Sequence, residues 1–253
     1  MIDFESFKRE FNIIAGPCAI ENKKQIETIA AAVKDSGATV LRGGAFKLRS
    51  DANSFMGLGP DGAKLLVNAG KKVGLPVLTE VTKISDLQFL SDVDILQIGT
   101  RNMQNYPLIT ETAKTGKIIL LKRGFGCTIK EYLQSVEYIK KEGNDKIILC
   151  ERGIRTFETA LRNTFDVSAV AILKDKTNFP VFADPSHASG DRKYVKRLSL
   201  SAVAIGCDGL EIEVHNAPEK ALSDREQALN LDEFKELVSQ VKELRKTVQN
   251  FYE

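Results

Sequence analysis

The chain has 253 residues, 43% of them hydrophobic, and a formal net charge of +2 at pH 7. This length and apolar content allow a full hydrophobic core in one large α/β domain or in two smaller domains. The charge balance argues against a nucleic-acid partner, because the sequence has no basic tail or arginine stripe that could neutralise a phosphate backbone.

The sequence lacks the signals of membrane insertion and secretion. It contains no run of about 18 or more uncharged apolar residues. Residues 1–11, which we interpret as a short N-terminal extension, mix acidic and basic side chains and lack the apolar centre of a signal peptide. Cysteines occur without CxxC spacing and too sparsely for a disulfide scaffold, at Cys18, Cys127, Cys150 and Cys207. We therefore expect a soluble cytoplasmic protein.

Short runs rich in Val, Ile and Leu alternate with amphipathic stretches along the chain. The runs predict strands at 12–16, 39–44, 76–81, 95–99, 117–123, 146–151, 180–184 and 209–214. The amphipathic stretches predict helices at 24–35, 62–73, 128–141, 195–205 and 231–248. Thr128 and Glu131 have the spacing of a capping box, which marks the start of one helix.

The order of these elements predicts the fold. Most strands are continuously apolar, as expected for a parallel sheet that is buried on both faces. Eight βα units in about 250 residues predict a TIM (β/α)8 barrel in which residues 1–253 form one domain. A doubly wound open sheet is the alternative, but it usually has a GxGxxG turn after the first strand, where this chain has GPCAIEN.

Residues that can bind a metal stand at or beyond several strand ends. In a TIM barrel such residues converge, because the active site lies at the carboxyl ends of the strands. Cys18, His187 and Glu213 follow or end strands, and Asp224 lies in the loop after the last one. A thiolate, an imidazole and two carboxylates suit Mn²⁺, Fe²⁺, Co²⁺ or Zn²⁺. Taken singly, each residue also has a plain structural interpretation, such as a small buried hydrophobe or a turn residue.

Basic residues form a second set at the strand ends. Its members are Arg42, Lys47, Arg49, Arg101, Lys122, Arg123 and Arg152. So many cations around one barrel mouth would repel each other unless a ligand with several negative charges balanced them. Guanidinium groups suit phosphate and carboxylate, so we predict such a ligand. The alternative is a rim of solvated bases that pair with neighbouring acids.

Seven segments together resemble the short, type I-beta 3-deoxy-D-arabino-heptulosonate 7-phosphate (DAHP) synthases. In chain order they are GPCAIE, RGGAFKLRS, ILQIGTRNMQN, LLKRG, ERGIRTFE, DPSHASG and IEVHNAPEKALSD. The DPSH motif and the EVH and KALSD motifs are highly specific. Members of this family are TIM barrels that use a divalent metal to condense phosphoenolpyruvate with erythrose 4-phosphate, the first step of the shikimate pathway. The resemblance implies that this chain has the same activity and forms a homotetramer or homodimer.

The resemblance also implies roles for individual residues. The metal would be held by Cys18, His187, Glu213 and Asp224. Phosphoenolpyruvate would be bound by Arg42, Lys47, Arg101, Lys122 and Arg152, with Glu80 near its reacting carbon. Arg49 and Ser50 would hold the sugar phosphate. Catalysis would involve Lys47, Cys18 and His187, with Lys47 or a metal-polarised water as the candidate for proton transfer.

The chain departs from the family pattern at several positions. Leu48 replaces the usual proline, and Asp51 adds a negative charge next to the expected sugar-phosphate site, which weakens the assignment of the acceptor sugar. Thr100 and residues 125–127 also differ from the commoner residues. Glu211 stands at a usually apolar, inward-facing position of the last strand, where a buried carboxylate needs a partner. On the same face, His215 is expected to support the site or to be a satisfied polar residue.

Two other functions compete with this interpretation. The sister enzymes, 3-deoxy-D-manno-octulosonate 8-phosphate synthases, use arabinose 5-phosphate and normally carry Lys-Ala-Asn-Arg-Ser in the loop where this chain has Lys47-Leu48-Arg49-Ser50. A non-catalytic phosphate-binding barrel would be supported by the loss of a metal ligand, but all four are present. The length leaves no room for an appended regulatory or chorismate mutase domain, so we expect little direct inhibition by phenylalanine or tyrosine.

Overall fold

The computed structural model describes residues 3–48 and 53–252, and it contains a closed barrel of eight parallel strands in chain order. All eight predicted strands are confirmed: β1 (Asn12–Gly16), β2 (Val40–Arg42), β3 (Val77–Val81), β4 (Ile95–Ile98), β5 (Ile118–Lys122), β6 (Ile147–Glu151), β7 (Val181–Ala183) and β8 (Gly209–Glu213). The barrel closes where β1 pairs with β8, from Asn12 opposite Gly209 to Gly16 opposite Glu213. This closure confirms the TIM barrel and excludes the open sheet.

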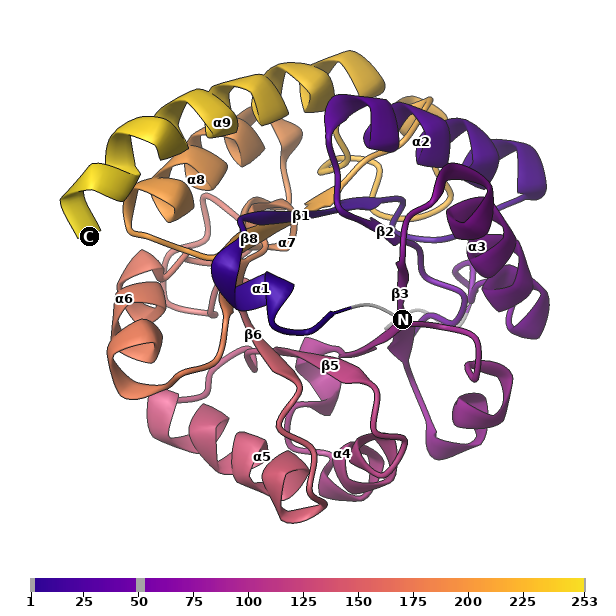
Figure 1. The fold of residues 1–253 in the computed structure, drawn as a ribbon. Helices are drawn as coiled ribbons and strands as arrows, with labels where there is room; N and C mark the ends of the chain where they lie inside the picture. The colour runs from indigo at the N-terminus through magenta and orange to yellow at the C-terminus, as the bar shows by residue number, and fades with distance from the viewer. Residues whose placement is uncertain (1–2, 49–52, 253) are drawn as a thin grey trace.

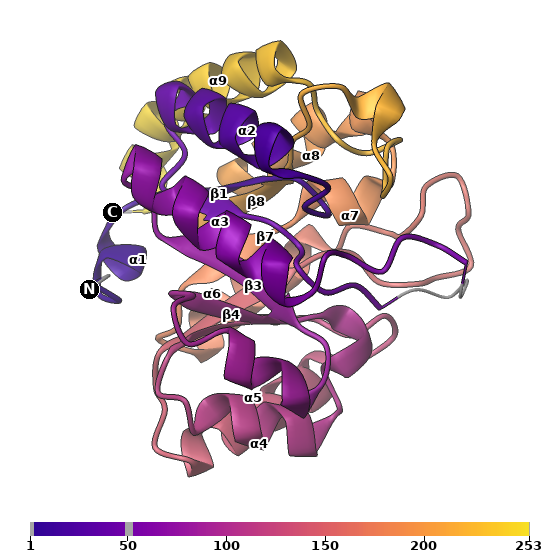
Figure 2. The same ribbon diagram turned by 90° about the vertical axis from the view of Figure 1, so that its right-hand side faces the viewer.

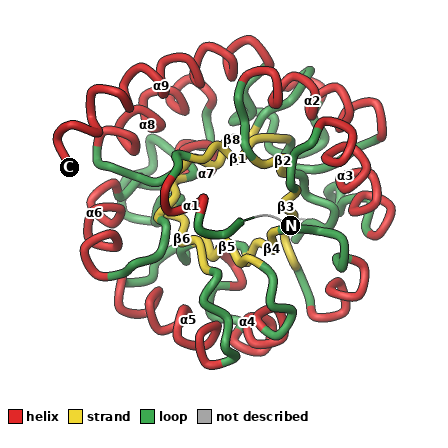
Figure 3. The backbone as a smooth tube through the Cα atoms, in the orientation of Figure 1, coloured by secondary structure: helices red, strands yellow, loops and turns green. Residues whose placement is uncertain are grey.

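Helices form a ring around the barrel (Figures 1 and 3). The predicted ones are confirmed as α2 (Lys23–Ser36), α3 (Pro60–Val73), α5 (Ile129–Lys141), α8 (Arg192–Ala204) and α9 (Leu231–Tyr252). The capping box forms, since Glu131 N donates to Thr128 Oγ1 at 3.2 Å and Thr128 N donates to Glu131 Oε2 at 2.7 Å. Among the described helices, none combines the length and the apolar character needed to span a bilayer.

The prediction missed the shorter helices. These are α4 (Tyr106–Ala113), α6 (Val167–Lys176), α7 (Pro185–Ser189) and three 3-10 turns, η1 (Ile84–Phe89), η2 (Thr100–Asn102) and η3 (Pro218–Lys220). A helix of ten residues or fewer shows too few turns for its apolar period to stand out. Side-chain caps nevertheless mark two of the starts, because Asn105 accepts from Leu108 N and Asp166 accepts from Ala169 N.

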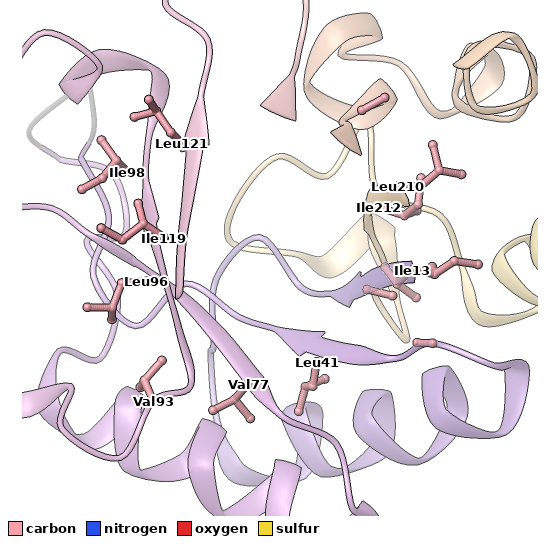
Figure 4. Close-up of a cluster of buried hydrophobic side chains, with 14 of the residues drawn as sticks. Ile13, Leu41, Val77, Val93, Leu96, Ile98, Ile119, Leu121, Leu210 and Ile212 are labelled. Atoms are coloured by element: carbon pink, nitrogen blue, oxygen red, sulfur yellow. The ribbon is translucent and has the colours of Figure 1, made fainter. Parts of the chain in front are cut away.

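Each strand is buried on both faces, which explains its continuous hydrophobicity. Side chains of the outer face pack against the helices, and part of this layer is shown in Figure 4. Side chains of the inner face form a separate cluster inside the barrel, made of Ile14, Val40, Leu78, Ile95, Ile118, Leu120, Ile148, Cys150 and Phe182. The inner cluster fills the lower part of the barrel and supports the residues that lie above it.

The first described residues close the bottom of the barrel. The short helix α1 (Ser6–Arg9) lies across this end (Figure 1). Its Phe7 belongs to the inner cluster, is 1% exposed and has its ring centroid 6.1 Å from that of Phe182. The N-terminal segment therefore contributes to the core.

Replacing Phe7 by alanine should destabilise the protein by about 3 kcal/mol, because the change removes buried apolar surface and leaves a cavity at the base of the barrel. The free energy of unfolding from urea denaturation measures this loss. Phe251→Ala is the control, since Phe251 is 75% exposed and surface changes alter stability by about 0.5 kcal/mol or less. Equal losses for the two variants would show that Phe7 does not seal the barrel.

Candidate active site

The inner face of the strands changes from apolar to charged toward their carboxyl ends. On β2 the apolar Val40 is followed two residues later by Arg42, and on β5 Leu120 is followed by Lys122, all four being buried. Alternation along a strand keeps each such pair on the same face. Figure 2 shows α1 at one end of the barrel and the long loops at the other, beyond this charged layer. The same layer contains Glu80, Gln97, Asp184, Glu211 and Glu213.

A cavity of ≈ 340 Å³ lies at this end of the barrel. It is lined by residues that the sequence predicted for the site, namely Lys47, Glu80, Arg101, Lys122, Arg152, His187 and Asp224. Two further arginines, Arg155 and Arg162, also line it and were not predicted. Both lie in the loop between β6 and α6, and the ERGIR segment, with arginines three residues apart, was the signal for the first of them.

The four predicted metal ligands meet at one edge of the cavity. Cys18, Glu213 and Asp224 offer ligand atoms that all lie within 4.8 Å of one another. His187, in α7 directly after β7, brings Nε2 to 3.2 Å from Glu213 Oε1 and to 4.0 Å from Asp224 Oδ2. Cys18 Sγ lies 3.1 Å from Asp224 Oδ2. Residues up to 206 positions apart in the chain thus form one cluster.

This cluster suits a divalent cation. Glu213 Oε1 is buried and, although Arg42 Nη1 and His187 Nε2 lie near it, it accepts no well-aligned hydrogen bond from the described residues, so it can still bind a cation. The sulfur, nitrogen and oxygen donors match the preferences of Mn²⁺, Fe²⁺, Co²⁺ and Zn²⁺. Burial and the charge of Glu213 raise the pKa of the Cys18 thiol to about 12. A bound cation would favour the thiolate and release that proton.

Asp184 holds His187 in the orientation that the cluster requires. Its Oδ2 lies 2.6 Å from His187 Nδ1, and its Oδ1 accepts from His187 N at 2.9 Å. With Nδ1 engaged, Nε2 faces Glu213 and is free to bind an ion. Burial would raise the pKa of Asp184, but His187 and Lys122, which also pairs with it, outweigh burial and hold that pKa well below its usual range.

Arg42 lies beneath the cavity and is not among the residues that line it. Its Nη1 is 3.1 Å from Glu213 Oε1 and 3.3 Å from Glu211 Oε1. Burial alone would lower the pKa of Arg42, but these two carboxylates outweigh burial and raise it. Lys122 Nζ lies 3.1 Å from Glu211 Oε1 as well. Arg42 and Lys122 are therefore the partners that the buried Glu211 requires.

Three other arginines at the cavity have no carboxylate partner in the part of the chain that the structure describes. Arg101, Arg152 and Arg155 surround the ring of Phe125, with guanidinium carbons 5.7, 5.1 and 4.3 Å from its centroid. Within residues 3–48 and 53–252, none of the three forms an ion pair. Arg152 is buried, which lowers its pKa, yet a guanidinium stays charged in proteins. The interpretation as a rim of paired bases thus does not hold for these three.

Arg123 is the basic residue that the structure assigns elsewhere. Its Nη1 donates to Glu151 Oε2 at 2.8 Å and to Asp166 Oδ2 at 2.7 Å. It follows Lys122 directly and so projects from the opposite face of β5. Arg123 ties β5 to β6 and α6 and is not among the residues lining the cavity.

Lys47 and Glu80 complete the cavity between β2 and β4. The side chain of Glu80 lies against Gly99, where a Cβ atom would be only 2.0 Å from Glu80 Oε1, so a larger residue at position 99 would displace the Glu80 carboxylate. Burial would lower the pKa of Lys47, but Cys18 and Glu80 outweigh burial and raise it. Leu48 also lines the cavity. The predicted sugar-phosphate residues Arg49 and Ser50, together with Asp51, lie outside the described residues.

His215 supports the loops around the site. Its Nδ1 accepts from Ala217 N at 3.0 Å, and its Nε2 lies 3.4 Å from Glu21 Oε1 and 3.1 Å from Gln25 Nε2. Glu21 in turn accepts from Leu222 N at 2.8 Å, two residues before Asp224. His215 therefore connects the segment after β1 to the loop that carries Asp224, as expected of a satisfied polar residue.

Comparison with known proteins identifies the family of the chain. The sequence profile of the DAHP synthetase I family matches residues 8–250. A phospho-2-dehydro-3-deoxyheptonate aldolase from Thermotoga maritima is 49% identical over 235 residues, which cover 92% of this chain and 70% of that relative. A 2-dehydro-3-deoxyphosphooctonate aldolase from Francisella tularensis subsp. holarctica is 32% identical over 255 residues, covering 93% of this chain and 92% of the relative.

Solved structures give the same result. The crystal structure of the Thermotoga maritima phospho-2-dehydro-3-deoxyheptonate aldolase (DAHP synthase) superposes with a TM-score of 0.92 at 48% identity, covering 94% of this chain and 70% of that one. A truncated form of 3-deoxy-D-arabino-heptulosonate 7-phosphate synthase from the same organism gives a TM-score of 0.89 at 46% identity and covers 94% and 88%.

Cys18→Ser should weaken the binding of Mn²⁺ by on the order of 100-fold, because a hydroxyl is a far poorer ligand for these ions than a thiolate. Equilibrium dialysis followed by elemental analysis measures the change. Cys207→Ser is the matched control, since Cys207 is buried but lies outside the cluster. Wild-type metal content in the Cys18 variant would remove Cys18 from the site.

Proposed function

The chain belongs to the DAHP synthetase I family, and we infer from this that it is a 3-deoxy-7-phosphoheptulonate synthase. It condenses phosphoenolpyruvate, erythrose 4-phosphate and water to 3-deoxy-D-arabino-heptulosonate 7-phosphate and inorganic phosphate. This reaction begins the shikimate pathway to chorismate and the aromatic amino acids. One observation in the structure carries the inference: a cavity with guanidinium groups that form no ion pair among the described residues lies directly beside four residues that could hold a metal ion.

The cations of the cavity suit the two anionic groups of phosphoenolpyruvate. Arg101, Arg152 and Lys122 line the cavity from three different strand ends, so they can approach its phosphate and its carboxylate from several sides. Arg155 adds a fourth positive charge on the Phe125 side. Arg42 lies beneath the cavity and contributes through its charge and through its contacts with Glu211 and Glu213.

Cys18, His187, Glu213 and Asp224 would hold the divalent metal, which we take to be Mn²⁺, Fe²⁺, Co²⁺ or Zn²⁺. When bound, such an ion supplies Lewis-acid polarisation of the aldehyde oxygen of erythrose 4-phosphate. His187 and Asp224 line the cavity, whereas Cys18 and Glu213 are not among its lining residues.

The residues of the cavity account for the course of the condensation. Arg101, Lys122 and Arg152 fix phosphoenolpyruvate so that its C3 faces the aldehyde and forms the new carbon–carbon bond. Glu80 lies beside the reacting carbons, where positive charge develops at C2 before water adds there. The resulting phosphohemiketal loses phosphate by cleavage of the carbon–oxygen bond. Lys47, which lines the cavity and is protonated at neutral pH, can donate a proton to the alkoxide that becomes the new hydroxyl group.

The acceptor sugar is assigned to erythrose 4-phosphate. The heptulosonate relative is 49% identical, whereas the octulosonate relatives are about 30% identical, so arabinose 5-phosphate is not favoured. We propose that Arg49 and Ser50 bind the sugar phosphate, as the family resemblance implies. The cytoplasmic location and the homotetramer or homodimer implied by the resemblance stay predictions.

An assay of phosphoenolpyruvate consumption tests the proposal. With erythrose 4-phosphate and Mn²⁺ we expect one phosphate released per phosphoenolpyruvate consumed, and a much slower reaction with arabinose 5-phosphate. Treatment with a chelator should abolish the activity, and added Mn²⁺ should restore it, because the ion polarises the aldehyde. A faster reaction with arabinose 5-phosphate would assign the chain to the sister activity. No reaction with either sugar, or one indifferent to the chelator, would contradict the function.

A further inference from the structure

Glu211 reaches across the interior of the barrel to two cations at once. It is fully buried on the inner face of β8. Its Oε1 lies 3.3 Å from Arg42 Nη1 on β2 and 3.1 Å from Lys122 Nζ on β5. Neither of these strands is a neighbour of β8, which pairs with β7 and β1. A single carboxylate oxygen therefore connects three separate strands.

The neighbouring acids do not duplicate this contact. Glu213 pairs with Arg42, and Asp184 pairs with Lys122, but each reaches only one of the two cations. Among the described residues, Glu211 is the carboxylate that touches both. Two positive charges beside the same oxygen atom repel each other, and the charge of Glu211 makes their approach favourable.

The contact of Glu211 with Arg42 and Lys122 affects the ligand site through Lys122. Lys122 lines the cavity, whereas Arg42 and Glu211 lie below it. We propose that Glu211 is a positioning residue that holds Arg42 and Lys122 under the anion pocket and limits the positive charge offered to phosphoenolpyruvate. This inference rests on the proposed function and names a determinant of substrate affinity in that same site.

The bound substrate and Glu211 compete for the charge of the same cations. Without the negative charge of Glu211, the positive charge of Lys122 would be less neutralised and would attract the anion more strongly. The enzyme would then bind phosphoenolpyruvate more tightly in the ground state. The orientation of Lys122 would at the same time become less defined, which lowers the rate of the chemical step. Stronger binding that is not specific to the transition state does not accelerate a reaction.

Glu211→Gln tests this inference, because it keeps the size of the side chain and removes its charge. We expect the KM for phosphoenolpyruvate to fall about threefold and kcat to fall about tenfold. A second measurement does not depend on turnover. In chelator-treated protein, inorganic phosphate should raise the Tm of E211Q more than that of the wild type, since the anion supplies the missing negative charge.

Two further variants make the result specific. Glu151→Gln is the matched control, because Glu151 is equally buried but pairs with Arg123 at 2.8 Å, outside the cavity. It should lower the Tm while leaving the KM and the phosphate effect unchanged. Glu211→Asp keeps the charge but shortens its reach, so its KM and kcat should lie between those of the wild type and E211Q.

A lower kcat with a lower Tm, an unchanged KM and a wild-type phosphate effect in E211Q would show a merely structural role and overturn the inference. If E211Q does not fold, E211D decides, and a wild-type KM and phosphate effect in that variant would overturn it. Failure of the wild-type protein to consume phosphoenolpyruvate would instead refute the proposed function, while the phosphate effect would still report on Glu211.

Discussion

Arg42, Asp184, Glu211 and Glu213 lie inside the barrel below the cavity, Lys122 lies at its lower edge, and all five side chains are almost fully buried. A buried charge costs several kcal/mol unless an opposite charge lies beside it, and here each cation contacts two carboxylates. The remainder of the site depends on this balance. His187 and Lys122 lower the pKa of Asp184 and so keep it charged, and His187 and Arg42 do the same for Glu213, whose carboxylate faces Cys18 and Asp224.

The closed barrel accommodates these buried charges because it separates them from the apolar core in two layers. The lower layer is apolar and is sealed by Phe7, whereas the upper layer is charged and opens into the cavity. Arg42 and Lys122 each contact two carboxylates, whereas Arg101, Arg152 and Arg155 form no ion pair within the described residues and lie around the cavity, where a ligand can reach them. Positive charge is therefore available at the position where an anionic substrate enters, and the metal donors stand at one side of it.

The sequence was sufficient to predict the barrel and the grouping of the four candidate metal ligands. Because strand ends converge in a TIM barrel, Cys18, His187, Glu213 and Asp224 could be assigned to one site before any distance between them was known. It was not sufficient for the pairing of the buried charges, since Glu211 meets partners on β2 and β5, and no local pattern encodes contacts across the barrel. The role of Arg123 could have been read from alternation, because its neighbour Lys122 faces inward. Arg162 lies in a long loop, where periodicity gives no information.

Anomalous diffraction from crystals grown with Mn²⁺ and phosphoenolpyruvate would locate the metal and the anion in one experiment. We expect a manganese peak bound by Cys18, His187, Glu213 and Asp224, with phosphoenolpyruvate beside it in contact with Arg101, Lys122 and Arg152. A manganese peak away from those four ligands, or phosphoenolpyruvate bound outside the cavity, would contradict this expectation.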